Sequence, residues 1–492
     1  MNQPRHDQFD EPALVSSSEP TLFVDLDGTL IKSDLLIESF FALALRDPRC
    51  LFLMPFWLAR GKAHLKGKIA ERVDMAPELL PYNAEFLGFL KAEAGRGRTL
   101  ILATASDQRL AQKVADHLGI FDGVLASDGR SNMSGERKLT AMRDAVGGGS
   151  FDYAGNAKVD LEIWPHARQA ILVNPEAGVE TGARRVATVS KVFDDVKPGL
   201  MPYLKAMRVH QWLKNLLVFV PLLMAHAWGS GMAILHAVLA FLAFGLCASS
   251  VYLLNDLLDL PSDRAHPRKR KRPFAAGDIP LLHGLWMMPL LLVGGLALAA
   301  FLPAMFIVSL LAYLATTLAY SLYLKSYVLI DVMILAGLYT LRVICGAFAI
   351  GSTLTFWLLA FSMCIFLSLA LVKRCSELIS LAKIDRLNAT GRDYHAGDLA
   401  YLTNMGTASG YLSVLVLALF INSPEVAARY AHPQGLWLLC PLLLYWVSRL
   451  WLKTGRGEMH DDPIVFTLKD RGSRFVILAC IAVVVASTVT LF

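Results

Sequence analysis

The chain is poor in charged residues and lacks the cysteine patterns that hold metals or disulfides. Of its 492 residues, 18% are charged and 55% are hydrophobic, a balance that soluble proteins of this size rarely show. Its seven cysteines include no CxxC pair, and most lie in apolar runs. We therefore expect reduced, packed thiols rather than a zinc site or a disulfide framework.

Two further absences narrow the class of protein. Residues 1–20 are polar and contain no apolar stretch of the kind found in secretory signals, so we expect a disordered leader there. The net charge is +6, but the basic residues cluster at the edges of apolar runs instead of covering a soluble face. This distribution follows the positive-inside rule of membrane proteins. It predicts a lipid bilayer as partner and no nucleic acid.

The chain divides by composition into a soluble part and a membrane part. Residues 21–175 alternate strand-like and helix-like segments, which predicts an α/β domain. A connector over 176–207 then leads to an all-α polytopic membrane domain over 208–492, whose apolar runs have the length of membrane spans. We expect about nine transmembrane helices, near residues 212–229, 231–254, 282–300, 303–324, 328–350, 354–373, 408–422, 433–453 and 474–492.

Basic residues are concentrated in alternate loops of the membrane part. They follow the second, fourth, sixth and eighth expected spans, and Arg429 is the exception in the opposite loops. Since basic loops stay in the cytoplasm, we expect a multi-pass inner-membrane protein with a cytoplasmic N-terminal domain. The C-terminus is then expected on the outer side.

The first chemical motif is Asp25-Leu26-Asp27-Gly28-Thr29, at the end of a short apolar strand. Carboxylates at i and i+2 of a strand point to the same side, and Gly28 permits a turn there. Two close acids repel each other unless a cation lies between them, and Mg²⁺ is the natural oxygen-bound cation. One acid could attack phosphorus while the other carries a proton.

Further polar residues follow later segments of the same domain: Thr104, Lys138, Asn156 and Asp160. With the Asp25 motif, they resemble the haloacid dehalogenase (HAD) phosphatase superfamily. The resemblance implies a Rossmann-like fold with a helical cap over about 34–95. It implies Asp25 as nucleophile, Asp27 as acid and base, Thr104 and Lys138 as phosphate ligands, and Asp160 as support for Mg²⁺.

Two features of this domain leave alternatives open. Asn156 stands where the family usually has an acid, and a neutral amide binds Mg²⁺ more weakly, so a scaffold without catalysis is the alternative. The cap stretch 50–68 is apolar and then basic, which suits either a helix on the membrane surface or a helix of the cap core.

The second motif, NDLLDLPSDRAHPRKRKRP, spans 255–273. Asn255, Asp259 and Asp263 are spaced four apart at a helix end and are predicted to share one face, with Asp256 as a further oxygen donor. Carboxylates at a membrane boundary need cations, and a Mg²⁺-diphosphate complex would supply them. His266, Lys269 and Arg272 would neutralise the remaining phosphate charge.

This motif resembles the NDxxDxxxD signature of the UbiA-type intramembrane prenyltransferases, and the resemblance covers most of 205–492. It implies a nine-helix bundle with a cytoplasmic polar mouth that binds a Mg²⁺-diphosphate donor. The aromatic-prenylating members carry a second aspartate-rich motif. Here the corresponding place reads LVKRCSEL, residues 371–378, with Lys373, Arg374 and Glu377.

That variation resembles a subgroup, the polyprenyl-phosphate phosphoribosyltransferases, and RVHQWLKN over 208–215 agrees with it. The resemblance implies phosphoribosyl diphosphate (PRPP), or another diphosphate, as donor and a polyprenyl phosphate lipid as acceptor. Glu377 would hold a ribose hydroxyl or a second metal. Further substrate-binding residues are expected at Arg208, Lys214, Asn215, Lys325, Arg342, Lys373 and Arg374. Arg342 lies inside a span, where an ion pair with Asp331 is the alternative.

Three functions therefore remain open. The first is phosphoribosyl transfer to the lipid, followed by dephosphorylation of the product by the fused phosphatase. The second is an aromatic prenyltransferase of the 4-hydroxybenzoate type. The third is a membrane-anchored phosphatase whose helices only bind lipid. A homo-oligomer is compatible with each of them.

Overall fold

The computed structural model describes residues 19–194, 199–382, 393–424, 426, 430–459 and 462–488. Most of the predicted leader, together with Pro198, Arg429, His460 and Asp461, lies outside these residues. The chain forms two compact units: Met1–Ala206 with Leu253–Trp286, and Met207–Tyr252 with Met287–Phe492.

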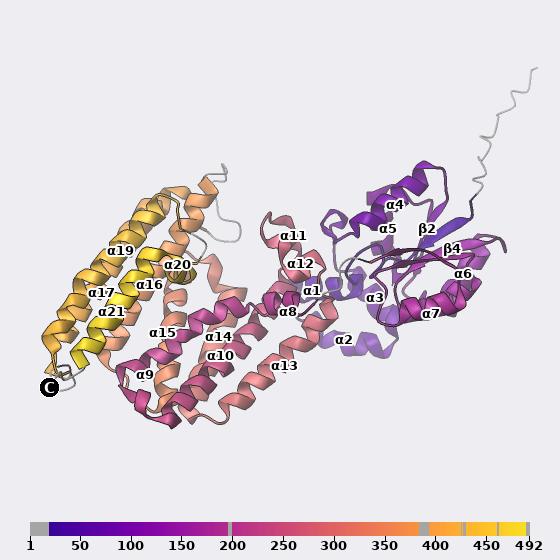
Figure 1. The fold of residues 1–492 in the computed structure, drawn as a ribbon. Helices are drawn as coiled ribbons and strands as arrows, with labels where there is room; N and C mark the ends of the chain where they lie inside the picture. Colours follow the sequence, from indigo (N-terminus) through magenta and orange to yellow (C-terminus); the bar gives the residue numbers. More distant parts are fainter. Residues whose placement is uncertain are drawn as a thin grey trace, which may run out of the picture. The chain divides into compact units, whose positions relative to one another are not determined.

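The first unit is built on a six-stranded parallel sheet with the strand order β3-β2-β1-β4-β5-β6. Helices α4 and α5 cover one face, and α6 and α7 cover the other (Figure 1). The strands are β1 (Thr21–Val24), β2 (Leu100–Asp107), β3 (Gly123–Ser127), β4 (Phe151–Gly155), β5 (Gln169–Val173) and β6 (Val189–Phe193). The central strands are buried on both faces, as expected for a parallel sheet, whereas the edge strand β6 is largely exposed.

The sheet extends past the boundary at residue 175 that the sequence suggested. Helix α7 (Val179–Val186) and β6 lie in the expected connector, and β6 pairs in parallel with β5. The helical cap is confirmed, but α4 (Ala84–Gly95), which was expected within it, packs on the sheet core through Phe86 and Leu90. The cap contains α1 (Leu35–Arg46), α2 (Cys50–Ala59), α3 (Lys62–Ala70) and η1 (Pro77–Leu79). Helices α5 (Gln108–Leu118) and α6 (Glu136–Ala145) follow along the chain.

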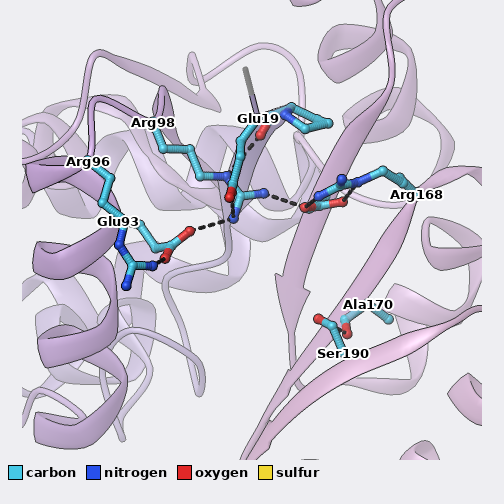
Figure 2. Close-up of polar contacts among 9 residues, drawn as sticks. Glu19, Glu93, Arg96, Arg98, Arg168, Ala170 and Ser190 are labelled. Atoms are coloured by element: carbon cyan, nitrogen blue, oxygen red, sulfur yellow. Dashed lines mark hydrogen bonds and ion pairs between the residues drawn. The ribbon is translucent and has the colours of Figure 1, made fainter. Parts of the chain in front are cut away.

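A buried ion-pair network holds the amino ends of the strands, at the edge opposite the Asp25 motif. Arg98 forms ion pairs with Glu93, at 2.8 Å, and with Asp152 of β4 (Figure 2). Asp152 also accepts a hydrogen bond from Arg168 at 2.7 Å. Asp152 and Arg98 are almost fully buried, so each depends on the other for neutralisation. The network stabilises the strands that carry the phosphatase motif at their other ends.

The remainder of the first unit is the segment that follows α10 (Gly231–Leu258). It contains α11 (Leu260–Ala265), η6 (Lys269–Lys271) and α12 (Pro273–Ala276). Arg264 of α11 forms a bidentate ion pair with Glu38 of α1, at 2.7 and 2.8 Å, and both side chains are almost fully buried. This pair connects the cap to the acidic motif.

The second unit is helical, and the described residues include eight helices that are long and apolar enough to cross a membrane. Helices α16, α17, α19 and α21 run side by side within it (Figure 1). The eight are α10, α13 (Leu281–Ala299), α14 (Ala304–Leu322), α15 (Ile330–Ile350), α16 (Phe356–Ala382), α17 (Leu399–Ile421), α19 (Leu439–Gly455) with the preceding η9 (Pro433–Leu438), and α21 (Arg471–Thr488).

The expected first span is a shorter apolar segment instead, formed by η4 (Val209–Phe219) and α9 (Val220–Met224). A 3-10 helix rises about 2.0 Å per residue against 1.5 Å in an α-helix, so these 16 residues reach about 30 Å. That is the thickness of a bilayer's hydrocarbon core. Gly346 of α15 packs against it, where an added Cβ would lie 2.1 Å from the Val218 carbonyl oxygen.

Candidate functional site

The motif Asp25-Leu26-Asp27-Gly28-Thr29 lies at the carboxyl edge of the parallel sheet. Asp25 and Asp27 follow β1, whose neighbours β2 and β4 bring Ser106 and Asn156 to the same edge. Gly28 has φ +76°, and a Cβ there would lie 2.3 Å from Asn156 Nδ2, so only glycine fits this turn. The predicted convergence of Asp25, Asp27 and Asn156 therefore has a physical basis in the strand order.

Lys138 neutralises the predicted nucleophile. Its Nζ lies 2.7 Å from Asp25 Oδ1 and donates to the Tyr153 hydroxyl at 2.7 Å. Burial raises the pKa of Asp25 to about 6, although the charge of Lys138 opposes that rise. A carboxylate held by one lysine in a buried site is arranged to bind or attack an anionic group once a further cation is present.

Asp27 accepts hydrogen bonds from two neutral donors. Its Oδ1 accepts from the Leu35 backbone N–H at 2.8 Å, and its Oδ2 from the Ser106 hydroxyl at 2.6 Å. Burial, with the nearby charge of Asp34, raises the pKa of Asp27 to about 7. That value suits a group that exchanges a proton near neutrality, as the sequence predicted.

Asp160 has a different role from the one predicted. Its Oδ1 accepts from the Tyr153 hydroxyl at 2.7 Å, and its Oδ2 accepts from the backbone N–H groups of Asn156 and Ala157, each at 2.9 Å. Both oxygens are thus engaged by protein donors. Asp160 positions the Asn156 loop and, through Tyr153, Lys138, which a motif position alone does not reveal.

Lys66 of α3 is a site residue that sequence reasoning missed. Its Nζ donates to the Ala105 carbonyl at 2.6 Å and to Asn132 Oδ1 at 3.2 Å. Burial lowers its pKa, and the charge of Asp27 opposes that shift, which places the ammonium group near the motif. Only folding brings this lysine from the cap to the edge of the sheet. Thr104, expected as a phosphate ligand, is buried, and its hydroxyl oxygen accepts from the Ser106 N–H at 3.0 Å.

The oxygen donors at this edge suit Mg²⁺ in type, although they are few. Across the described ranges, no group of three or more His, Cys, Asp or Glu side chains is arranged to hold a metal. Asn156 Oδ1 already accepts from Thr29 Oγ1 at 3.1 Å. An ion held here would rely on Asp25, the Asn156 amide oxygen and the phosphate of its ligand.

The acidic motif of 255–273 is organised around Arg272. Its Nη1 lies 3.1 Å from Asp256 Oδ1 and 2.5 Å from Asp263 Oδ2, and both acids are almost fully buried. The predicted spacing of four holds, because Asp263 N–H bonds to the Asp259 carbonyl and Asp259 N–H to that of Asn255. The turns of α10 and α11 thus continue across their boundary.

Asp263 satisfies the chemistry of a cation ligand. Burial raises its pKa, although the charge of Arg272 opposes the shift. Its Oδ1 is buried and has no hydrogen-bond partner among the described residues, and Lys269 Nζ lies 4.0 Å away. An orphaned carboxylate oxygen beside a second acid fits a bound divalent cation.

His266 does not provide the cation that the sequence predicted. Its Nδ1 accepts from the backbone N–H groups of Arg268 and Lys269, at 3.2 and 3.3 Å. Burial and the charge of Lys269 lower its pKa, so the neutral ring is favoured. His266 shapes the basic loop and leaves Lys269 and Arg272 to carry the positive charge.

In the second unit, Lys214 forms an ion pair with Asp462, which also lies in the field of Lys373. Asp462 caps α20 (Pro463–Lys469) by accepting from Ile464 N–H at 3.0 Å. Burial raises its pKa, but the charges of the two lysines prevail and lower it. The structure thus pairs Lys214 with Asp462, a residue to which the sequence assigned no role.

Arg342 and Arg374 differ from expectation. Arg342 donates to Asn215 Oδ1 at 3.1 Å and to the Tyr313 hydroxyl at 2.8 Å, and its predicted alternative partner Asp331 instead pairs with Arg374 at 2.5 Å. Arg374 is fully buried and also contacts Glu377. It therefore serves as an internal counter-ion, which makes it unsuitable as the predicted phosphate ligand.

Two further predicted substrate ligands are Arg208 and Lys325. Arg208 lies over the Tyr252 ring at 5.0 Å, in a left-handed conformation with φ +51°. Lys325 lies in η7 (Leu324–Ser326) and is half-buried. Both remain candidates on the strength of the sequence.

Two protein families match different parts of the chain. The model of the UbiA prenyltransferase family matches residues 216–468, and that of haloacid dehalogenase-like hydrolases matches 22–162. An uncharacterized protein of Sinorhizobium fredii, y4nM, is 37% identical and covers 92% of this chain and 88% of its own length.

Two further relatives each match somewhat more than half of the chain. Nodulation protein NoeC of Azorhizobium caulinodans is 35% identical over 57% of this chain and 92% of its own. Decaprenyl-phosphate phosphoribosyltransferase of Mycolicibacterium smegmatis is 32% identical over 58% of this chain and 91% of its own.

Among solved structures, a UbiA homologue of Archaeoglobus fulgidus bound to GPP and Mg²⁺ aligns with a TM-score of 0.44 at 18% identity. It covers 58% of this chain and 99% of its own. With the family match over 216–468 and a relative that matches along most of the chain, the protein belongs to the UbiA prenyltransferase family, as a multi-pass membrane transferase with an N-terminal HAD-like hydrolase domain.

Proposed function

We propose that the protein transfers the 5-phosphoribosyl group of PRPP to a polyprenyl phosphate in a Mg²⁺-dependent reaction. The observation that carries the proposal is that Asp462 pairs with Lys214 and lies in the field of Lys373, a residue of the segment 371–378 where the resemblance leads one to expect carboxylates in an aromatic prenyltransferase. Two lysines around one acid leave a net positive charge, which favours an extra phosphate on the donor or acceptor.

The acidic motif supports the diphosphate half of this reaction. Asp256 and Asp263, with Asn255 and Asp259 as further oxygen donors, would hold Mg²⁺, which supplies charge neutralisation to the donor diphosphate. Arg272 bridges two of these acids and would turn part of its charge to the phosphate. The bond from ribose C1 to the diphosphate breaks, and a lipid phosphate oxygen forms the new bond to C1.

The hydrolase domain would act on the product. The transferred sugar retains its 5-phosphate, and the pair of Asp25 and Asp27 is arranged for nucleophilic attack and proton transfer. Attack by Asp25 would transfer the phosphoryl group to the carboxylate, and water would then release inorganic phosphate. Because both activities share one chain, the intermediate is at high effective concentration.

A direct assay tests the proposal. Purified protein is incubated with Mg²⁺, PRPP and polyprenyl phosphate, and the lipid fraction is analysed by mass spectrometry. We expect a phosphoribosylated lipid and its dephosphorylated form. Prenylation of 4-hydroxybenzoate from a polyprenyl diphosphate, with PRPP inert, would favour the aromatic prenyltransferase instead. Phosphatase activity with neither transfer would favour the membrane-anchored phosphatase.

We also propose that the hydrolase domain is cytoplasmic and the C-terminus lies outside, in an inner membrane. Eight long spans alone would place Gly231 and the C-terminus on the same side. The 30 Å reach of Val209–Met224 supports a ninth crossing, which brings the N-terminal domain to the side of the basic loops. A cysteine at the exposed Ser262 should react with an impermeant reagent from the cytoplasm, and one at the exposed Ala431 only from outside.

A further inference from the structure

Helix α2 of the cap exposes an unusual amount of apolar surface. Its sequence CLFLMPFWLA contains no charged residue. One side packs through Cys50, Met54 and Trp57 onto a small core of the cap. The other side is open, with Phe52 81% and Phe56 70% exposed, and further exposed side chains at Leu51, Leu53 and Leu58. The cap-core alternative from the sequence therefore explains only half of the helix.

A cationic cavity follows this helix directly. It has a volume of about 390 Å³ and is lined by Arg60, Lys62, His64, Arg130 and Arg137, with Asn132 and small residues. As far as the structure describes the chain, no carboxylate contributes to that lining. Several cations around one hollow, beside exposed aromatic rings, are complementary to phosphate groups at an apolar boundary.

The cavity adjoins the phosphatase site. Asn132 lines it and accepts from Lys66, whose ammonium group lies in the field of Asp27. Asn132 and Lys66 therefore connect the cationic cavity to the surroundings of the predicted acid. This continuity connects the apolar helix, the cationic cavity and the catalytic carboxylates within one unit.

We propose that α2 and the cavity of Arg60, Lys62, Arg130 and Arg137 form a surface that docks onto an anionic phospholipid bilayer. The α2 side chains enter the interfacial layer while the cations bind lipid phosphates, so that the phosphatase site meets a lipid-linked substrate. Catalytic use of the surface rests on the proposed phosphatase activity, whereas docking itself does not.

A bilayer fits this surface better than a second copy of the chain does. A symmetric contact would bring the same patch of both subunits together and place cation against cation. The eight spans keep a bilayer within tethering distance of the cap at all times, which raises the effective concentration of the interaction. Apolar and basic residues acting together are also the combination that gives stable membrane attachment.

The first test measures docking in the full chain in nanodiscs of phosphatidylglycerol and phosphatidylcholine. A spin label is introduced at position 52 through a genetically encoded amino acid, so the native cysteines remain. We expect collisions with oxygen to exceed those with a water-soluble nickel chelate. A label at the exposed Glu85 of α4 should show the opposite. Equal accessibility to the chelate at both positions, or spin–spin broadening between copies, would overturn the proposal.

The second test measures use of the surface. The double variant Phe52→Glu/Phe56→Glu should lower hydrolysis of a membrane-embedded lipid phosphate about tenfold or more, because two buried aromatic contacts with lipid are lost. Hydrolysis of soluble p-nitrophenyl phosphate should be unchanged, which also shows that the domain is folded. Val186→Glu, an exposed apolar residue of α7, is the matched control and should alter neither rate.

The lipid dependence separates docking from the proposed phosphatase function. The native protein should hydrolyse the lipid phosphate faster in membranes that contain phosphatidylglycerol than in membranes of pure phosphatidylcholine. Arg60→Ala/Lys62→Ala should remove this difference, while Phe52→Glu/Phe56→Glu should lower the rate in both kinds of membrane. An unchanged lipid dependence would contradict the proposal. If the native protein hydrolyses neither substrate, the phosphatase proposal fails, and the spin-label measurement still decides whether α2 docks.

Discussion

The two acidic sites of this protein solve the same electrostatic problem in opposite ways. At the phosphatase edge, Asp25 has one lysine and Asp27 accepts from neutral donors, and burial raises both pKa values to about 6 and about 7. In the transferase motif, Asp256 and Asp263 share Arg272 as a permanent cation. The first site can exchange protons near neutrality, whereas the second brings two buried acids to one arginine and is suited to bind a metal–diphosphate.

The largest expected effect is at the phosphatase nucleophile. Asp25→Asn should lower phosphate release from the lipid product by about 10⁴-fold, because an amide cannot form the acyl-phosphate. Phosphoribosyl transfer should continue, and the phosphorylated lipid should accumulate in the mass spectrum. Loss of transfer in this variant would show that the two sites are not chemically independent.

The reciprocal change tests the transferase motif. Asp263→Ala should lower transfer by about 10³-fold, since the divalent cation loses a ligand, and such a cation is worth several kcal/mol in the transition state. Asp259→Ala should act in the same direction, and excess EDTA should abolish transfer by the native chain. As a control for folding, both variants should still hydrolyse p-nitrophenyl phosphate in the presence of Mg²⁺, and the native chain should do so once Mg²⁺ is added back after EDTA. Full transfer in EDTA would refute the metal assignment.

A smaller effect is expected at the second polar cluster. Lys373→Ala should weaken apparent affinity for the phosphorylated substrates about 10- to 150-fold, the value of one lost charge-assisted contact of 1.5–3 kcal/mol. The KM values for PRPP and polyprenyl phosphate, measured separately, identify which phosphate Lys373 contacts.

Asp462→Asn is the variant matched to Lys373→Ala, and it should change the apparent affinity in the opposite direction. It preserves an acceptor for the cap of α20 but removes the charge that neutralises Lys214 and Lys373. Affinity for the anionic substrate should therefore rise. A fall in both variants would indicate that the cluster supports the fold and does not bind phosphate.

The smallest effect is expected at Glu38, in the cap. Glu38→Gln removes the charge opposite Arg264 and should lower the free energy of unfolding by about 1–3 kcal/mol. Because Arg264 lies next to Asp263, transfer should also fall by about threefold, near the lower limit of couplings between sites. Glu85→Gln, an exposed change on α4, is the control. Unaltered transfer in a destabilised Glu38→Gln protein would limit this pair to a structural role.

Sequence reasoning succeeded where chemistry depends on residues close in the chain. The spacing of Asn255, Asp259 and Asp263, the turn at Gly28 and eight of the nine expected long apolar helices follow from local geometry and composition. It was less successful for partners across the fold. The sequence suggested Arg342 as a partner of Asp331, but Asp331 pairs with Arg374, 43 positions later in the chain. Residue type alone does not indicate which of two distant arginines an acid will meet.

The sequence by itself predicted two domains, two motifs whose oxygen donors suit Mg²⁺ and the lack of a second acidic motif, since these depend on residue types at fixed spacing. Only the tertiary structure decided how each charge is compensated. In the folded chain, Asp462 forms an ion pair with Lys214, and Asp160 accepts hydrogen bonds from Tyr153 and from the backbone. The aromatic rings Phe52 and Phe56 of α2 stay exposed. The physical reason is that charge compensation and burial depend on distances between side chains far apart in the chain, which packing alone sets.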